Sequence, residues 1–333
     1  MTINGSPTEK WTMVQAINNA LGLALARDRR VLIMGQDVGK NGGVFRVTDG
    51  LLDEFGAERV IDAPLAESGI IGTAIGMAIY GLRPVAELQF AGFSFVAFNQ
   101  IVSQATKMRY RSGGLYTVPL VIRAPFGGGV RTPELHSDSV EAFYTHAQGI
   151  KVVIPSNPYD AKGLLQAAIE DPDPVLFLEH MKLYRSSRQA VPTGYYTVPL
   201  GQAAVVREGR DLSLFAYGAM VAVAGQAAEL VEAEQAVSIE VIDLRTISPL
   251  DEAAIAASVN KTGRAVVVHE AARTAGIGAE IIAVINERCL YALLKPVERV
   301  TCPDTPFPVP SVEDAVIPTP KRVAQAIRRV LAP

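Results

Sequence analysis

Residues 62–90 read DAPLAESGIIGTAIGMAIYGLRPVAELQF, and this stretch carries the clearest signal of the fold class. Apolar and small residues at helical spacing predict a helix over 67–80, and the run that follows predicts a strand over 83–90. Helices that alternate closely with strands are typical of βαβ units and a mostly parallel sheet.

The same alternation continues along the whole chain. Before residue 181 it predicts helices over 13–27 (with Thr12 as N-cap), 94–111, 159–170 and from Asp138 or Ser139 to His146, and strands over 31–34, 118–124, 151–154 and 175–178. The polar, proline-containing stretch 181–199 interrupts the pattern and predicts a linker. Beyond it we expect strands over 212–217, 239–244, 265–269 and 298–301, and helices over 219–234, 250–260, 278–290 and 321–331. The sequence therefore predicts an α/β protein of two doubly wound parallel-sheet domains, residues 1–190 and 200–333.

The composition is that of a globular protein and disfavours several classes of function. Of 333 residues, 49% are hydrophobic and 20% charged, and 31 basic against 34 acidic side chains leave no excess to bind nucleic acid. No apolar run reaches the ~18–20 residues of a membrane span. The mean hydropathy of +0.22 indicates buried subunit interfaces. The N-terminal residues show no targeting signal, and two cysteines, Cys289 and Cys302, fit a cytoplasmic location.

Common catalytic motifs are absent from the sequence. It contains neither Cys-x-x-Cys nor His-x-x-x-His for a zinc site, and no Gly-x-x-x-x-Gly-Lys phosphate loop. Gly276-Ile277-Gly278 lies at a predicted helix start but lacks the third glycine of a dinucleotide loop. This partial match leaves an NAD-dependent oxidoreductase as one weakly supported alternative.

Glu67 is the first candidate functional residue. It lies where a strand passes into a helix made almost entirely of small and apolar residues, which predicts a position at the mouth of a buried interface. A carboxyl group in such a place can share a proton with a ligand nitrogen. The alternative interpretation is a first-turn glutamate favoured by the helix dipole.

His136 is the second candidate. It follows a strand end and three consecutive glycines, Gly127 to Gly129, and it precedes a predicted helix. Loops after parallel strands are where such folds place their chemistry, and a histidine there can act as an acid or a base near neutral pH. The alternative is a flexible surface loop with an incidental histidine.

Taken together, these segments resemble the β subunits of the thiamine-diphosphate-dependent decarboxylase component of 2-oxoacid dehydrogenase complexes. The matching motifs are GQDV (35–38), GGVFR (42–46), PLAESG (64–69), RPVAELQF (83–90), GGGV (127–130), TPELHS (132–137), KVVIP (151–155), KLYR (182–185) and DLRT (243–246). The resemblance covers nearly the whole chain. One departure is Gln36, where most relatives are expected to carry glutamate.

The resemblance implies roles for individual residues. Glu67 matches the glutamate that hydrogen-bonds N1′ of the cofactor's aminopyrimidine and favours its imino tautomer. Phe93 matches the aromatic residue that stacks on this ring, and Leu65 and Gln89 match its neighbours. His136 matches the loop histidine that is implicated in passing the acyl group to lipoamide. A potassium ion is also implied, held mainly by backbone carbonyls, at Leu120, Ala168, Ile169, Asp171 and Asp173. The alternative for the last two is an ordinary helix-ending turn.

The sequence lacks the Gly-Asp-Gly segment that this family of cofactor sites needs to hold a divalent metal and the diphosphate. The resemblance therefore implies that an α subunit supplies Mg²⁺ and the diphosphate half, in an α2β2 tetramer. We expect a small 2-oxoacid substrate, pyruvate by preference, and docking to a lipoyl acyltransferase core through Glu280, Glu287, Glu313, Asp314 and the terminal carboxylate of Pro333. Branched-chain 2-oxoacid or acetoin dehydrogenase β subunits, and a docking scaffold without catalysis, are the alternatives.

Overall fold

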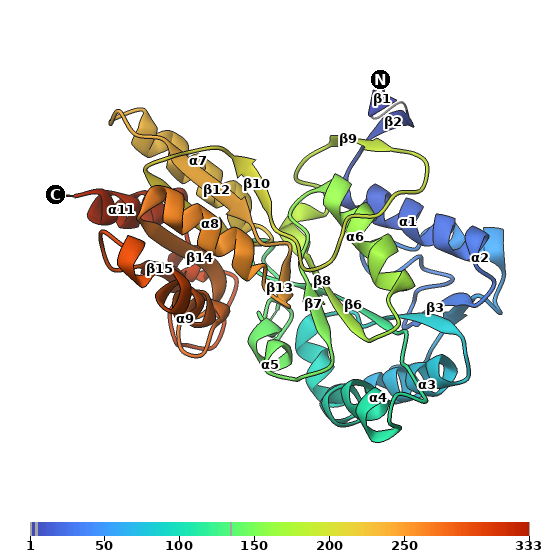
Figure 1. Cartoon of the computed structure of the whole chain (residues 1–333). Helices are drawn as coiled ribbons and strands as arrows, with labels where there is room; N and C mark the ends of the chain where they lie inside the picture. Colours follow the sequence, from blue (N-terminus) through green and yellow to red (C-terminus); the bar gives the residue numbers. More distant parts are fainter. Residues whose placement is uncertain (1, 4–5, 134, 333) are drawn as a thin grey trace.

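The computed structural model describes residues 2–3, 6–133 and 135–332, which form two lobes side by side (Figure 1). The helices are α1 (Met13–Arg27), α2 (Leu51–Phe55), α3 (Glu67–Ile79), α4 (Met108–Arg111), α5 (Glu141–Thr145), α6 (Pro158–Glu170), α7 (Met220–Glu232), α8 (Glu252–Thr262), α9 (Ile277–Cys289), α10 (Glu313–Val316) and α11 (Pro320–Leu331). The strands are β1 (Thr2–Ile3), β2 (Ser6–Trp11), β3 (Val31–Gly35), β4 (Val60–Asp62), β5 (Arg83–Glu87), β6 (Val121–Phe126), β7 (Lys151–Val153), β8 (Val175–His180), β9 (Gln189–Pro192), β10 (Ala204–Arg207), β11 (Leu212–Ala216), β12 (Ile239–Asp243), β13 (Thr246–Ser248), β14 (Ala265–Ala272) and β15 (Glu298–Cys302).

The first lobe contains a sheet in the order β13-β7-β8-β6-β5-β3-β4, in which all strands except β13 run parallel. One face packs against α1 and α6, and the other against α3 and the segment that follows β5 (Figure 1). The Thr12 side chain and Gln15 form a reciprocal capping box at the start of α1, so the predicted cap is confirmed. A smaller antiparallel sheet, β1-β2-β9, lies beside α6.

The second lobe contains a sheet in the order β10-β12-β11-β14-β15, parallel except for β10. Its two faces pack against α7 with α11 and against α8 with α9. The predicted α/β fold with two doubly wound sheets is confirmed.

The two lobes share secondary structure and a core. β13 follows β12 in the second lobe, yet it pairs antiparallel with β7 and so extends the first sheet. One continuous cluster of buried apolar side chains includes Phe126 of the first lobe and Phe215 of the second. Because a shared strand and a shared core join the lobes, the second is a fixed part of the framework around the first. The predicted division into residues 1–190 and 200–333 stays a prediction.

The segment predicted as an α-helix over 94–111 has a different structure. It consists of a 3-10 stretch (Ala91–Ala97), a π-helical stretch (Asn99–Gln104), a 3-10 turn (Ala105–Lys107) and α4. The Ser68 hydroxyl, on α3, donates to the carbonyl oxygen of Val96 at 2.5 Å. A side-chain donor of this kind competes with the α-helical amide for the carbonyl, which gives a physical reason for the break.

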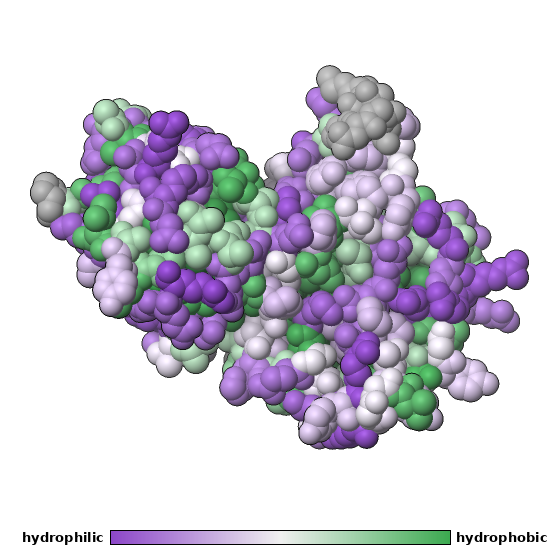
Figure 2. Space-filling view, in the orientation of Figure 1, coloured by the Kyte–Doolittle hydropathy of each residue, from purple (hydrophilic) through white to green (hydrophobic). Residues whose placement is uncertain are grey.

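Two further expectations about elements were wrong. α5 begins after Val140 and no side chain caps it, so the cap predicted at Asp138 or Ser139 does not form. Strands β1, β2, β9, β10 and β13 were not expected from the sequence. Among the described residues, no helix is both long and apolar enough to cross a bilayer. The face seen in Figure 2 mixes hydrophilic and hydrophobic patches, and a notch separates the two lobes at the top of the view.

Candidate active site

Glu67 is the first residue of α3 and lies directly after the turn that leaves β4. Only 9% of it is exposed, whereas Leu65, two residues earlier, is 71% exposed. No other group within residues 2–3, 6–133 and 135–332 hydrogen-bonds to the Glu67 carboxylate. A nearly buried acceptor that the chain itself leaves without a donor is a place where a ligand N–H fits.

The exposed side of α3 is made of small residues. Gly69, Gly72, Thr73 and Gly76 all lie on the surface, and Tyr80, which follows the helix, is 91% exposed. The buried side carries Ile70, Ile71, Ala74, Ile75 and Ala78. The sequence predicted a buried interface along this helix, and in the chain alone its small-residue side faces solvent.

The carboxyl ends of the parallel strands gather the other predicted residues. Gln89 follows β5, and its amide donates to Asp37 Oδ2, after β3, at 3.0 Å. Phe93 lies on the adjoining 3-10 stretch, half-buried, with its ring centroid 5.7 Å from that of Phe90. The carboxyl edge of a parallel sheet is where such folds bind ligands.

His136 reaches this edge from the loop after β6. Its ring centroid lies 4.3 Å from that of Phe90 and 5.1 Å from that of Phe93, both at steep angles. The carbonyl of Leu135 passes so close to Gly92 that a Cβ there would overlap it. The structure therefore brings Phe93 and His136 together, with Gly92 permitting the approach.

A buried ion cluster lies under this edge and was not expected from the sequence. Arg123 of β6, 1% exposed, donates to Glu179 Oε1 and Oε2 at 2.6 and 2.8 Å and to Glu87 Oε2 at 2.6 Å. The Tyr184 hydroxyl also donates to Glu179 Oε2, at 2.7 Å. Burial, with the nearby Glu179 carboxylate, raises the pKa of Glu87 despite the opposing effect of Arg123. The sequence did contain a signal for this cluster, because the predicted strands 83–90 and 118–124 carry the charged residues Glu87 and Arg123.

The glycine-rich loop after β6 contacts the second lobe. Gly128 N–H donates to Glu270 Oε1 of β14 at 2.5 Å, and Glu270 Oε2 lies 2.9 Å from His180 Nε2. Burial raises the pKa of Glu270, but the His180 interactions and the Gly128 N–H outweigh it, and the net pKa is lowered. Gly127 and Gly128 are therefore buried where this loop meets the second lobe, whereas Val130, Arg131 and Leu135 further along the loop are exposed.

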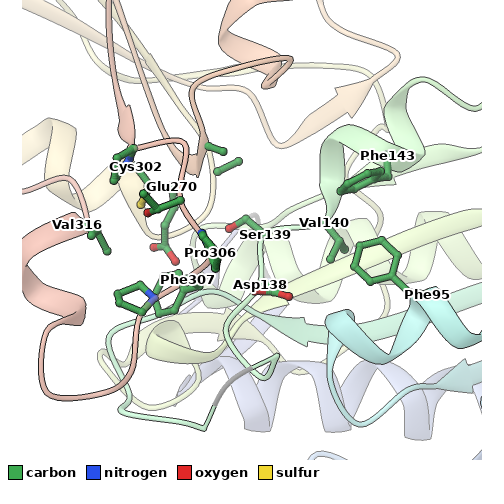
Figure 3. A pocket seen from close by; sticks show the side chains of 15 residues that line it. Phe95, Asp138, Ser139, Val140, Phe143, Glu270, Cys302, Pro306, Phe307 and Val316 are labelled. Carbon is green, nitrogen blue, oxygen red and sulfur yellow. The ribbon is translucent and has the colours of Figure 1, made fainter.

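A cavity of about 330 Å³ lies between the lobes next to this loop (Figure 3). Phe95 and Phe143 line it from the first lobe, and Glu270 and Phe307 from the second. Ser139 also lines it, and its hydroxyl oxygen is buried without a partner in the part of the chain that the structure describes.

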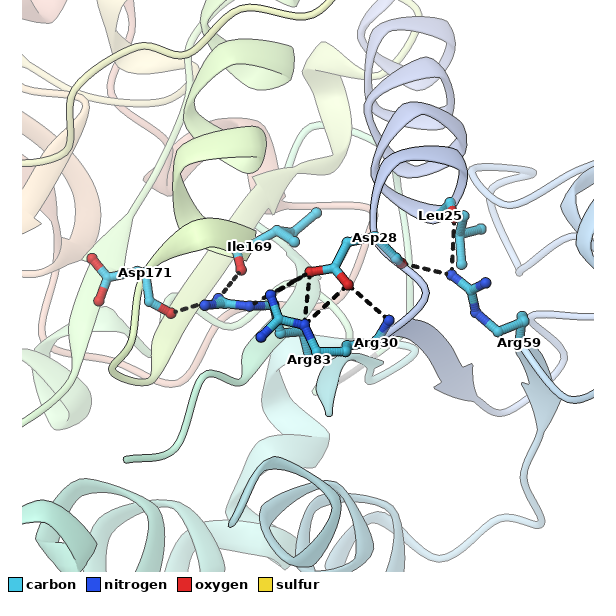
Figure 4. Close-up of polar contacts among 7 residues, drawn as sticks. All are labelled: Leu25, Asp28, Arg30, Arg59, Arg83, Ile169 and Asp171. Atoms are coloured by element: carbon cyan, nitrogen blue, oxygen red, sulfur yellow. Dashed lines mark hydrogen bonds and ion pairs between the residues drawn. The ribbon is translucent and has the colours of Figure 1, made fainter. Parts of the chain in front are cut away.

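The residues that the resemblance assigns to potassium lie at the opposite edge of the sheet: they are Leu120, Ala168, Ile169, Asp171 and Asp173. The carbonyl oxygens of Ile169 and Asp171 both accept from Arg83 Nη1, at 2.7 and 3.3 Å (Figure 4). Leu120 O accepts from Val175 N at 2.9 Å, and Ala168 O from Asp171 N at 3.3 Å. The carboxylates of Asp171 and Asp173 pair with Lys151 and Arg109. No cluster of three or more His, Cys, Asp or Glu side chains suited to a metal ion occurs among the described residues.

The acidic residues predicted for docking fall into two groups. Glu280 and Glu287 are exposed on α9. Glu313 is fully buried, which corrects its expected place on a docking surface, and Asp314 pairs with Arg131. Pro333 lies outside the described residues.

Comparisons with known proteins agree with this architecture. The family model described as transketolase, pyrimidine binding domain, matches residues 9–187, and that of the transketolase C-terminal domain matches residues 201–323. A split-gene transketolase, solved as an inactive beta4 tetramer, superposes with a TM-score of 0.77 at 22% identity, covering 97% of this chain and 99% of that one. A transketolase mutant from Pichia stipitis gives 0.71 at 14% identity, over 99% of this chain and 48% of that one. These structures share the fold.

Much more similar sequences carry one common name. The pyruvate dehydrogenase E1 component subunit beta of Bacillus subtilis (strain 168) is 56% identical over 320 residues, which cover 96% of this chain and 98% of that protein. The protein of the same name from Staphylococcus aureus (strain N315) is 53% identical over the same shares. Fold and site thus define a two-domain protein of the transketolase-like class. Within that class, the chain belongs to the family of pyruvate dehydrogenase E1 component β subunits.

Proposed function

We propose that this chain is the β subunit of a thiamine-diphosphate-dependent 2-oxoacid dehydrogenase that acts on pyruvate and transfers the acetyl group to lipoamide. Membership of the family named for pyruvate dehydrogenase supports pyruvate over branched-chain 2-oxoacids and acetoin. The cofactor, when bound, supplies the thiazolium electron sink for decarboxylation.

Glu67 is the residue proposed to hold the cofactor's aminopyrimidine. The single observation that carries the proposal is Glu67 itself: the residue is only 9% exposed, and no donor of the described chain hydrogen-bonds to its carboxylate. With the cofactor bound, Glu67 would hold N1′ of the aminopyrimidine by one proton shared between its carboxyl group and that ring nitrogen. Phe93, Leu65 and Gln89 surround the ring in this proposal. Leu65 is exposed here, so its contribution requires the bound ring or a partner to cover it.

His136 is proposed to act on the acyl group as it leaves for lipoamide. Its ring packs against Phe93, which places it beside the proposed pyrimidine position and at the rim of the carboxyl edge. A histidine at the rim can donate or accept a proton near neutral pH as the lipoyl sulfur reacts.

An α subunit is proposed to complete the site in an α2β2 tetramer. The small-residue side of α3 supports this, because small residues permit close approach of a partner's backbone. The missing Gly-Asp-Gly segment supports a partner that holds Mg²⁺ and the diphosphate. A scaffold without catalysis fits less well, since docking alone needs no unpartnered buried carboxylate.

The direct test compares the chain alone with the chain co-expressed with its α partner. We expect the lone chain to bind thiamine diphosphate poorly and to release no CO2 from pyruvate, and the assembly to do both. A purified chain that decarboxylates pyruvate unaided would contradict the proposal.

Three finer assignments complete the proposal. Potassium is proposed to bind at Leu120, Ala168, Ile169, Asp171 and Asp173, as the resemblance implies, which requires Arg83 Nη1 to release the Ile169 and Asp171 carbonyl oxygens that it now occupies. An equal melting temperature of the protein in K⁺ and in tetramethylammonium buffers would contradict the proposed potassium site.

Docking of the acyltransferase core is proposed through Glu280 and Glu287, and we expect the affinity of this docking to weaken with salt. A cytoplasmic location is supported by two buried cysteines that form no disulfide.

A further inference from the structure

The loop that carries His136 is clamped by the second lobe at two points. The first is Glu270, on β14, which accepts the Gly128 N–H at 2.5 Å and is itself held 2.9 Å from His180. Glu270 is 5% exposed and His180 is 1% exposed. Hydrogen bonds to a buried charged acceptor are stronger than those between neutral groups, so this contact fixes the loop firmly.

Gly127 and Gly128 allow the loop backbone to pack directly against side chains of both lobes, with no room for a Cβ at either position. Gly127 has a φ of +86° and packs so closely on the His180 ring that a Cβ would overlap it. A Cβ on Gly128 would overlap Phe307, which lines the cavity between the lobes together with Glu270 (Figure 3). The backbone approaches the second lobe more closely than any other residue type would permit.

The second clamp lies three residues further along the loop. Arg131 adopts a left-handed φ of +60°, and its guanidinium pairs with Asp314 and lies 3.6 Å from the buried Glu313. Beyond it the chain returns to the first lobe, where Leu135 packs on Gly92 and the His136 ring meets Phe93.

We propose that Glu270 is a positioning residue: by holding the Gly128 N–H, it makes the second lobe set the place of His136 at the rim of the site. Arg131 serves the same clamp at its exposed end. This assigns the second lobe a part in acyl transfer, although none of its described residues was assigned to chemistry. The inference rests on the proposed role of His136.

A merely structural Glu270, joining the lobes as a general staple, would behave differently. Its loss would loosen the whole second lobe and lower all activities together. A positioning Glu270 acts on one loop, so its loss should affect the step that uses His136 more than decarboxylation. Local hydrogen exchange and the split between the two half-reactions distinguish these cases.

The experiment uses the assembled αβ enzyme with Glu270→Met, which removes the acceptor while nearly preserving volume, and Glu270→Gln, which keeps an oxygen for Gly128. In Glu270→Met we expect exchange in peptides spanning 127–137 to rise about tenfold, the equivalent of one lost hydrogen bond to a charged group. Acyl transfer to the lipoyl domain should fall by a similar factor, and CO2 release with an artificial acceptor by no more than about threefold. Glu270→Gln should restore most of both losses.

Glu240→Met is the matched control, because Glu240 is a buried glutamate on β12 of the same sheet that contacts Ser258 and Lys261 and no part of the loop. It should leave the exchange of 127–137 unchanged. Arg131→Ala, which removes the second contact of the loop with Asp314 and Glu313, should also raise exchange in the loop. Unchanged loop exchange in both Glu270→Met and Arg131→Ala, or equal losses in both half-reactions, would overturn the positioning role. If the loop loosens but His136→Ala keeps acyl transfer, the role of His136 fails while the positioning stands.

Discussion

Glu67→Gln separates the role of the Glu67 carboxylate in catalysis from any role in folding. Glutamine has the same shape and can still hydrogen-bond, but it cannot supply a shared proton. Since no described group donates to this carboxylate, the substitution breaks no contact within the chain. We therefore expect the free energy of unfolding to change by less than about 0.5 kcal/mol. General acid–base groups contribute about 10²–10⁴-fold, so kcat should fall by that factor, or about 2.7–5.4 kcal/mol of barrier.

The assay is CO2 release from pyruvate by the αβ assembly with an artificial electron acceptor, alongside thermal unfolding of the same samples. The matched control is Glu252→Gln, because Glu252 is also a first-turn glutamate of a helix and pairs with exposed Arg288. It should lower stability only slightly and leave activity intact. If Glu67→Gln keeps more than about a tenth of the activity, less than ~1.4 kcal/mol of barrier is involved, and the proposed proton role is wrong.

Three further predictions follow from other residues. His136→Ala should lower acyl transfer to the lipoyl domain more than decarboxylation, and equal losses in both assays would assign it only a structural part in the loop. Arg123→Met should destabilise the chain by about 3–5 kcal/mol in denaturant unfolding, because it leaves Glu87 and Glu179 buried without their cation; a double variant with Glu179→Gln should recover part of this, and no recovery would contradict the coupling. Burial lowers the pKa of His269 to about 4, and neither ring nitrogen is partnered among the described residues, so the unfolded chain binds the extra proton between about pH 4 and 6.5. Its stabilising contribution, about 3 kcal/mol above that window, should be lost as pH falls through it, and His269→Gln but not the exposed His146→Gln should flatten this dependence.

Local sequence patterns correctly predicted those helices whose formation depends mainly on their own residues. The apolar spacing after Thr12 predicted α1 with Thr12 as its N-cap, and the small residues after Glu67 predicted α3. The α-helix expected over 94–111 failed because the hydroxyl of Ser68, distant in sequence, takes the Val96 carbonyl. No helical periodicity can show a competitor that comes from another element.

Predicting the site required information about register and docking that one element does not carry. Arg123 meets Glu87 and Glu179 only because three parallel strands align in register, so the sequence alone does not show which groups neutralise it. His180 and Glu270 lie 90 residues apart and meet only when the lobes dock. Glu67 and His136 were found through their motifs, and their roles stay predictions.

The surface around Glu67 supports the proposal that the chain works only in an assembly. Leu65 and Val96, whose segments lie beside the start of α3, are 71% and 61% exposed, whereas Glu67 is 9% exposed and its carboxylate accepts no hydrogen bond from the described residues. Exposed apolar side chains of this kind around a polar group mark an interaction surface. A partner that covers them removes water from the carboxylate, and electrostatic interactions strengthen as the local dielectric falls. In the proposed assembly, the hydrogen bond between Glu67 and a bound ring nitrogen is therefore strongest once the partner is in place, and we expect assembly and activation to coincide for this half of the site.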